Sequence, residues 1–128
     1  MTRGHVLLYS DRPGIYGAEQ INHSVACAAA RARYQVTFAQ AYADHHLIAE
    51  REALGVGHEW LADDDIYDLH QVSPSLTDEA EPLRILTDAR PDLILFSDSC
   101  PFSNLKAKQV AAKLGIPFVS AVHCFNPQ

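Results

Sequence analysis

The sequence predicts a doubly wound α/β fold, in which about five parallel strands form one sheet with helices on both faces. Short apolar runs and helix-like segments alternate five times along the 128 residues. Alternation of this kind is typical of parallel βαβ units. One run, residues 93–96, is apolar at every position, as expected for a strand covered on both faces. The length fits one domain spanning residues 1–128.

Strands and helices follow one another through the whole chain. Strands are predicted at residues 5–9, 35–40, 58–62, 93–96 and 118–122. The first helix is predicted over residues 18–33, where apolar side chains recur at helical spacing and fall on one face. These side chains are Ile21, Val25, Ala28, Ala29 and Ala32.

Three further helices have capping or breaking residues near their ends. They are predicted over residues 44–54, 82–89 and 101–114. Asp44 is a good N-cap and Gly55 a good terminator for the first of them. Pro82 suits a first helical turn, and Gly115 ends the last helix. The inner face of that last helix is predicted to carry Ala107, Val110, Ala111 and Leu114.

Composition and charge exclude several classes of protein. The net charge is −6, and fourteen of the sixteen acidic residues lie between positions 44 and 98. A basic stripe with interleaved aromatics is absent from the sequence, so nucleic-acid binding is not predicted. No apolar run approaches the length of a transmembrane helix, and the first run is too short for a signal peptide. We therefore expect a cytoplasmic protein without a transmembrane segment.

The loop after the first strand has the sequence GIYGAE, residues 14–19. Gly14 and Gly17 lack a Cβ, so the backbone can turn sharply and approach a ligand closely. If the helix starts at Ala18, its free N–H groups point beyond the carboxyl end of the sheet and favour an anion such as phosphate. The alternative is a tight strand-to-helix turn. Neither the dinucleotide-binding motif nor the P-loop motif matches, because Arg12 replaces a glycine and Ala18 follows Gly17.

The other polar residues of note follow the fourth and fifth strands. His123 comes directly after the fifth strand, where its imidazole can donate a hydrogen bond to a sugar hydroxyl or a phosphate. A metal site from Asp98, Cys100, His123 and Cys124 is conceivable, but the spacing does not demand one, so no metal is predicted. The three cysteines include no CxxC pair and are expected to be reduced thiols.

These pieces together resemble the N-terminal half of a family-four retaining glycosyltransferase of the GT-B fold. The resemblance rests on the Gly-x-x-Gly-Ala-Glu loop, on RPDLILF at residues 90–96 and on KLGIPFVSAVH at residues 113–123. It covers nearly the whole chain and implies a Rossmann-like domain. The reaction implied transfers a sugar from a nucleotide-sugar to an acceptor hydroxyl with retained anomeric configuration. The donor is a substrate, so no cofactor is implied.

The resemblance also implies a role for individual residues. The glycine loop of the family lies under the donor diphosphate, and the histidine that ends the fifth strand lies beside the transferred sugar. By position, Gly14, Gly17 and Ala18 would contact the diphosphate, and His123 would be catalytic. The acceptor pocket would include Tyr16, Glu19, Gln20, Ser97 and Asp98.

One departure from the family pattern affects activity. The family binds the nucleotide in a C-terminal domain that carries two glutamates eight residues apart, and no two glutamates here have that separation. We therefore expect the chain alone to be inactive and to need that domain in cis or a partner chain in trans. The alternative is a non-enzymatic α/β binding or regulatory module. A phosphoacceptor receiver domain fits less well, because His123 stands where its lysine is expected.

Overall fold

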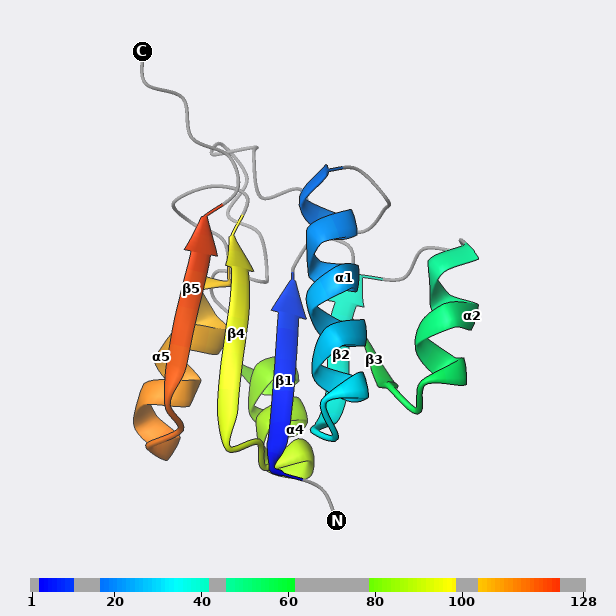
Figure 1. The fold of residues 1–128 in the computed structure, drawn as a ribbon. Helices are drawn as coiled ribbons and strands as arrows, with labels where there is room; N and C mark the ends of the chain where they lie inside the picture. The colour runs from blue at the N-terminus through cyan, green and yellow to red at the C-terminus, as the bar shows by residue number, and fades with distance from the viewer. Residues whose placement is uncertain (1–2, 11–16, 42–45, 62–78, 99–103, 123–128) are drawn as a thin grey trace.

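The chain forms one five-stranded parallel sheet with helices on both faces (Figure 1). The computed structural model describes residues 3–10, 17–41, 46–61, 79–98 and 104–122. In chain order the elements are β1 (His5–Ser10), α1 (Gly17–Arg31), β2 (Gln35–Ala41), α2 (His46–Ala53), β3 (Gly57–Leu61), α4 (Ala80–Ala89), β4 (Leu93–Asp98), α5 (Leu105–Leu114) and β5 (Phe118–Val122). The predicted fold class is confirmed, and every predicted strand is present within one residue at its start and two at its end.

The strand order places β1 at the centre of the sheet. The order is β3-β2-β1-β4-β5, so the chain moves outward from β1 in one direction and later in the other. Leu8 of β1 lies in register with Phe38 of β2 on one side and with Leu95 of β4 on the other. In sheets of this kind, ligands bind beyond the carboxyl ends of the strands, where the order reverses. That point lies between β1 and β4.

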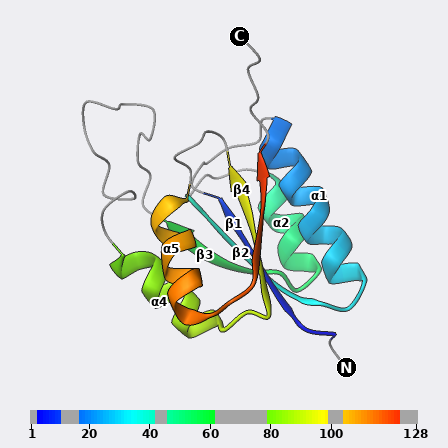
Figure 2. The same cartoon turned by 90° about the vertical axis from the view of Figure 1, so that its left-hand side faces the viewer.

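Each face of the sheet has its own apolar core. Figure 2 shows α4 and α5 against one face and α1 and α2 against the other. Ile94 and Phe96 of β4 pack with Ile85 of α4 and Val110 of α5. On the opposite face, a second core packs around Phe38 of β2. Strand residues alternate between the two cores because successive side chains point to opposite faces.

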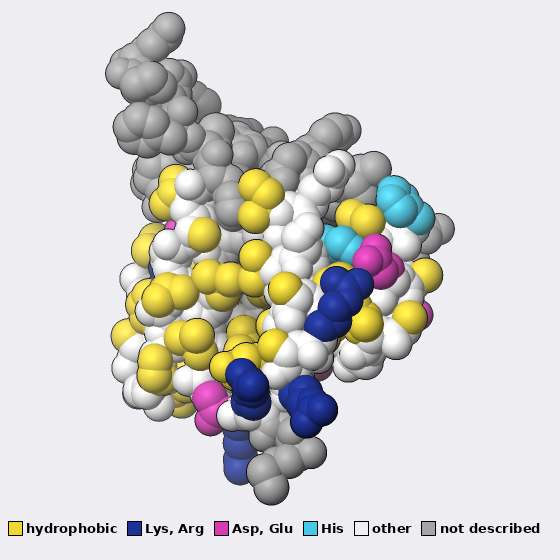
Figure 3. All heavy atoms as spheres, viewed as in Figure 1, with side chains coloured by type: hydrophobic (Ala, Val, Ile, Leu, Met, Phe, Trp, Pro, Cys, Tyr) yellow, Lys and Arg dark blue, Asp and Glu magenta, His cyan; other side chains and the backbone are white. Residues whose placement is uncertain are grey.

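The α1 side of β4 and β5 is only partly covered. Leu93 and Val119 are 37% and 51% exposed, and Ile21 and Val25 on the neighbouring side of α1 are 53% and 40% exposed. Figure 3, viewed as in Figure 1, shows many hydrophobic side chains on this face of the molecule. The expectation that residues 93–96 are covered on both faces is therefore wrong for the α1 side. The helical spacing of Ile21 and Val25 does not identify the buried face of α1.

Glycines end two of the helices as predicted. Gly55 follows α2 with φ of 81°, and Gly115 caps α5 with φ of 71°. Both values lie in the left-handed region, where a Cβ would be strained. The start of α5 differs from the prediction, because its N-cap is Asn104 and its first residue is Leu105. Leu114, expected on the inner face, is 45% exposed at the end of the helix.

An ion pair joins the two helices of the α4–α5 layer. Lys113 Nζ donates to both carboxylate oxygens of Glu79, at 2.9 and 3.0 Å. This hydrogen bonding lowers the pKa of Glu79 below its ordinary value of 4.5. A carboxyl group with a lowered folded pKa stabilises the fold above its unfolded pKa, and that contribution is lost as the pH falls through the folded pKa.

We therefore expect Glu79→Gln to weaken the dependence of the unfolding midpoint on pH below about 4.5, the unfolded value for a glutamate. The measurement is urea unfolding of both proteins at pH 7, 5, 4 and 3. The difference in stability between them should be largest at pH 7 and shrink toward pH 3. A difference that is constant across this range would show that Glu79 titrates as it does in the unfolded chain.

Candidate functional site

Two serines lie side by side where the strand order reverses. Ser10 ends β1 and pairs in register with Ser97 of β4. Both side chains are buried. Buried hydroxyls need hydrogen-bond partners, and α1 supplies one to Ser97. The carboxyl end of the sheet therefore carries polar groups at the point where a ligand is expected.

Asn22 links helix α1 to this pair of serines. Its Nδ2 donates to Ser97 Oγ at 2.7 Å, and its side chain is buried. Asn22 lies in the second turn of α1, which begins at Gly17. The bond therefore fixes the first turns of α1 against β4, and the N-terminus of the helix opens at the reversal point.

Asp98 lies on the opposite face of the sheet from Ser97. Its Oδ2 accepts a hydrogen bond from Lys108 Nζ at 2.6 Å, and its Oδ1 accepts one from Asn104 Nδ2 at 3.0 Å. Asn104 Nδ2 also donates to the carbonyl oxygen of Ser97 at 2.9 Å. Asp98 is thus a buried carboxylate with two protein donors, which hold the start of α5 against the end of β4.

The structure describes some of the predicted site residues and not others. Gly17, Ala18 and Glu19 are the first three residues of α1, which begins one residue before the predicted start. Gln20 is exposed at the edge of an open groove of about 470 Å³ on α1. Ser97 and Asp98 are adjacent in sequence but face different helices. Gly14, Tyr16 and His123 lie outside the described residues, so the roles assigned to them stay predictions.

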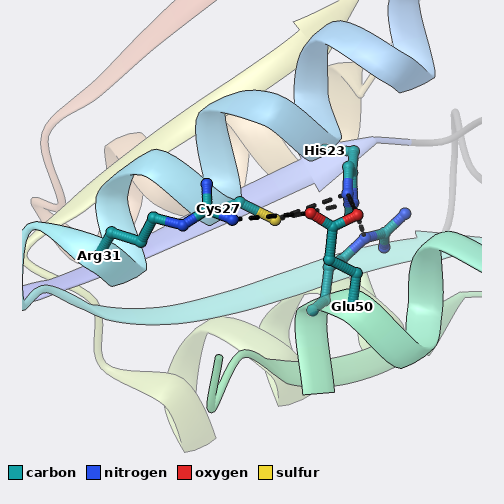
Figure 4. A network of polar contacts seen from close by, with 5 residues as sticks. His23, Cys27, Arg31 and Glu50 are labelled. Carbon is teal, nitrogen blue, oxygen red and sulfur yellow. Dashed lines mark hydrogen bonds and ion pairs between the residues drawn. The ribbon is translucent and has the colours of Figure 1, made fainter. Parts of the chain in front are cut away.

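A second polar network lies between α1 and α2 (Figure 4). His23 Nε2 and Glu50 Oε2 are 2.9 Å apart, and Cys27 Sγ is 3.6 Å from the same nitrogen. Arg51 Nε donates to His23 Nδ1 at 2.9 Å, and Arg51 Nη1 donates to Gln40 Oε1 at 2.7 Å. The network joins α1, α2 and the end of β2.

The arginine determines which nitrogen of His23 carries the proton. A guanidinium group only donates, so Nδ1 of His23 must accept, and in the neutral ring Nε2 carries the hydrogen. Nε2 then donates to Glu50. This hydrogen bond lowers the pKa of Glu50 below its ordinary value. The imidazole thus connects the positive charge of Arg51 to the negative charge of Glu50.

The burial of Arg51 is unusual for a charged residue. Its side chain has no exposed area, and its guanidinium carbon lies 4.1 Å from the centre of the Phe38 ring. Burial lowers the pKa of Arg51, but a guanidinium group stays protonated in proteins. Among the described residues, its Nη2 has no hydrogen-bond partner.

Cys27 is a buried thiol beside this network. Burial raises the pKa of Cys27 above its ordinary value, and the charge of Glu50 raises it further, against a smaller opposite effect of Arg31 and Arg51. The thiol is therefore protonated at neutral pH and does not neutralise Arg51.

Sequence reasoning missed this second network. One signal was available, because His23 and Cys27 are four residues apart on a predicted helix and so share a face. No comparable signal exists for Arg51, since an arginine in a short helix is ordinarily exposed. Its burial follows from the position of α2 beside α1 and β2.

Comparison with known proteins identifies the fold. CalG4, the calicheamicin glycosyltransferase, superposes with a TM-score of 0.64 at 19% identity, covering 100% of this chain and 32% of CalG4. A glycosyltransferase from Rickettsia africae gives a TM-score of 0.67 at 11% identity, with coverage of 100% and 32%. This chain therefore spans about a third of each glycosyltransferase. These likenesses show the fold.

The same fold also occurs in a domain of a hydrogenase. The C-terminal domain of a hydrogenase from Pyrococcus furiosus gives a TM-score of 0.64 at 15% identity, and the match covers 95% of this chain and 94% of that domain. No protein-family model and no curated protein sequence matches this chain. None of the described helices is both long enough and apolar enough to cross a membrane.

Proposed function

We propose that this chain is the N-terminal, acceptor-side domain of a glycosyltransferase. The complete enzyme would transfer a hexose from a nucleotide-sugar donor to an acceptor hydroxyl with retained anomeric configuration. The GT-B-like fold shared with two solved glycosyltransferases supports this proposal. Fold likeness alone does not define an activity, which depends on the groups at the reversal point of the sheet.

The observation that carries the proposal is the position of the α1 N-terminus. A helix of fifteen residues begins at Gly17, beyond the carboxyl end of β1, and Asn22 holds it against Ser97. Free N–H groups and the helix dipole at such an N-terminus stabilise an anion. In sugar transfer, negative charge grows on the leaving diphosphate, and groups that stabilise this charge lower the barrier.

The rest of the reaction would need residues beyond this chain. On the acceptor side, Gln20 is exposed and its amide can contact an acceptor hydroxyl, whereas the buried Ser97 positions α1 through Asn22. A donor-binding domain, supplied in cis or in trans, would hold the nucleotide and most of the sugar. The matched glycosyltransferases are about three times as long as the segment covered here, which leaves room for such a domain.

A binding or regulatory module is the second candidate. The hydrogenase domain supports it, because there a domain of this fold and nearly this size matches over almost its whole length. Dependence of any activity on a nucleotide-sugar would separate the two candidates, since a binding module has no use for a sugar donor.

Ala18→Asp tests the diphosphate site. An aspartate in the first turn of α1 suits the helix dipole, so the melting temperature should stay the same or rise. The added charge should nevertheless weaken binding of inorganic pyrophosphate, the part of the donor that is assigned to this chain, by about tenfold, through repulsion worth about 1.4 kcal/mol. Isothermal titration calorimetry with pyrophosphate measures this on the full chain.

Ala28→Asp is the matched control. It introduces the same charge at an exposed position more than two turns along the same helix. Its dissociation constant should equal that of the unchanged chain. Equal binding of pyrophosphate by Ala18→Asp and the unchanged chain, or no binding of pyrophosphate by the unchanged chain, would contradict the role of the α1 N-terminus.

A further inference from the structure

We propose that His23, Cys27 and Glu50 form a binding site for one divalent transition-metal ion, with Zn²⁺ as the best fit, between α1 and α2. The site is distinct from the reversal point of the sheet and does not depend on the proposed sugar transfer. Its three donor atoms all lie within 4.8 Å of one another. No spacing in the sequence demanded a metal, so this inference comes from the arrangement of the two helices.

Two of the three donor pairs have nearly the separations of a tetrahedral zinc site. With Zn–S and Zn–N bonds of about 2.3 and 2.1 Å, a tetrahedral ion holds sulfur and nitrogen about 3.6 Å apart. The observed distance from Cys27 Sγ to His23 Nε2 is 3.6 Å. Two zinc ligands of nitrogen and oxygen lie about 3.3 Å apart, and His23 Nε2 and Glu50 Oε2 are 2.9 Å apart. Cys27 Sγ and the Glu50 carboxylate lie within 4.8 Å of each other, so Glu50, whose side chain is 51% exposed, has to rotate to admit the ion.

The backbone explains why the three residues meet. His23 and Cys27 are four residues apart on α1 and therefore lie one above the other on one helix face. Glu50 projects from α2 toward the same point, as Figure 4 shows. His23 and Cys27 are buried, whereas the Glu50 side chain is 51% exposed. The exposed side of Glu50 gives the ion a path from solvent and leaves the fourth position to water.

The chemistry of the donors selects the metal. A thiolate, an imidazole and a carboxylate are all zinc ligands, and the thiolate disfavours Mg²⁺ and Ca²⁺, which prefer oxygen. The second oxygen of Glu50 lies 3.7 Å from Arg31 Nη2, so a partner outside the site would orient the coordinated carboxylate.

Binding of the ion requires proton movements at two residues, Cys27 and His23. The Cys27 thiol loses its proton to solvent, because the thiolate is the ligand. The ring of His23 gives up the proton on Nε2 and takes one on Nδ1, so that Nε2 can bind the metal. Arg51 Nε can then no longer donate to Nδ1, and Arg51 keeps its bond to Gln40 and its contact with Phe38. The net reaction releases one proton to solvent.

Loss of the Arg51–His23 hydrogen bond and the positive charge of Arg51 both disfavour binding of the ion. The affinity should therefore be weaker than that of a zinc site with four protein ligands. It should still be strong enough to be seen with micromolar protein, because three donors are held ready by two helices.

Cobalt titration of the full chain tests the site, because Co²⁺ takes zinc sites and its spectrum reports the ligands. The protein is kept reduced with a phosphine rather than a thiol. We expect intense visible bands of tetrahedral Co²⁺ and a thiolate-to-cobalt charge-transfer band in the near ultraviolet, saturating at one ion per chain. Zn²⁺ should abolish both signals and raise the melting temperature of the protein.

Single substitutions show which cysteine is responsible. Cys27→Ser should abolish the charge-transfer band, and Glu50→Gln should weaken Co²⁺ binding by at least about tenfold. Cys100→Ser and Cys124→Ser are the matched controls and should leave the spectrum unchanged. Circular dichroism confirms that each variant is folded. A chain without a charge-transfer band, or a band that survives Cys27→Ser and is lost with Cys100→Ser or Cys124→Ser, would overturn the proposal.

Discussion

Replacing Arg51 with alanine is expected to lower the free energy of unfolding by about 3 kcal/mol. The guanidinium group has no exposed area and stacks on Phe38. Its removal leaves an open volume beside Phe38 and removes the hydrogen bonds that Arg51 donates to His23 Nδ1 and Gln40 Oε1. Loss of a hydrogen bond in a buried network costs about 1–3 kcal/mol, which partial access of water to the new space reduces. Urea unfolding at pH 7 measures the loss.

Arg31→Ala is the control for this prediction. Arg31 also lies beside Glu50, at 3.7 Å, but its side chain is 60% exposed. An exposed ion pair contributes at most about 1 kcal/mol, and often nothing measurable. Losses of similar size at positions 31 and 51 would show that burial of the guanidinium group is not what makes Arg51 important. A double-mutant cycle of Arg51→Ala with His23→Ala should give a coupling energy of about 1–2 kcal/mol.

Phe96→Ala is expected to lower the free energy of unfolding by about 4 kcal/mol. Phe96 is fully buried, and its ring lies 5.6 Å from the Tyr9 ring and 5.3 Å from the Phe118 ring, measured between centroids. Truncation removes the largest side chain of β4 from the α4–α5 core and leaves a cavity that the surrounding strands and helices cannot fully close. Chemical unfolding with one probe for the sheet and one for the helices measures the change.

Phe118→Ala is the matched control on the neighbouring strand. Phe118 packs against the same ring but is 38% exposed on the edge strand β5. It buries less area, so its loss should cost about half as much as that of Phe96. If the two substitutions cost the same, the core of this domain would not be centred on β4.

The two predictions concern different faces of the sheet, and both bear on the proposed site. Phe96 precedes Ser97 and Asp98, so packing of its ring helps to fix the positions of these two residues at the carboxyl end of β4. The Arg51 network holds α2 against α1, whose N-terminus carries the proposed diphosphate contacts. Stability measurements therefore need to accompany every binding measurement on this chain.

Much of the fold follows from local features of the sequence. The apolar runs predicted all five strands. Gly55 and Gly115 marked two helix ends, because the left-handed conformation there is strained for a residue with a Cβ and glycine has none. The order of strands and helices also predicted a parallel sheet, since parallel neighbours need a crossover between them. From this topology the start of α1 could be placed at the edge of the sheet where a ligand is expected.

Other features depend on which elements become neighbours. Spacing alone suggested an apolar face of α1 at Ile21 and Val25, yet α1 buries Asn22 and His23, because Ser97 lies beneath one and Arg51 beside the other. A periodic pattern shows that residues share a face, but not which surface that face meets.

The sequence by itself determined the α/β class, the parallel sheet and the start of α1 to within one residue, because these depend on local backbone preference and on periodicity. Only the tertiary structure decided that Ser97 and Asp98 face different helices and that Arg51 is buried. It also decided that the donor atoms of His23, Cys27 and Glu50 lie close together. Each of these facts is a contact between segments distant in the sequence. Such contacts depend on how helices and strands pack, which no local pattern encodes.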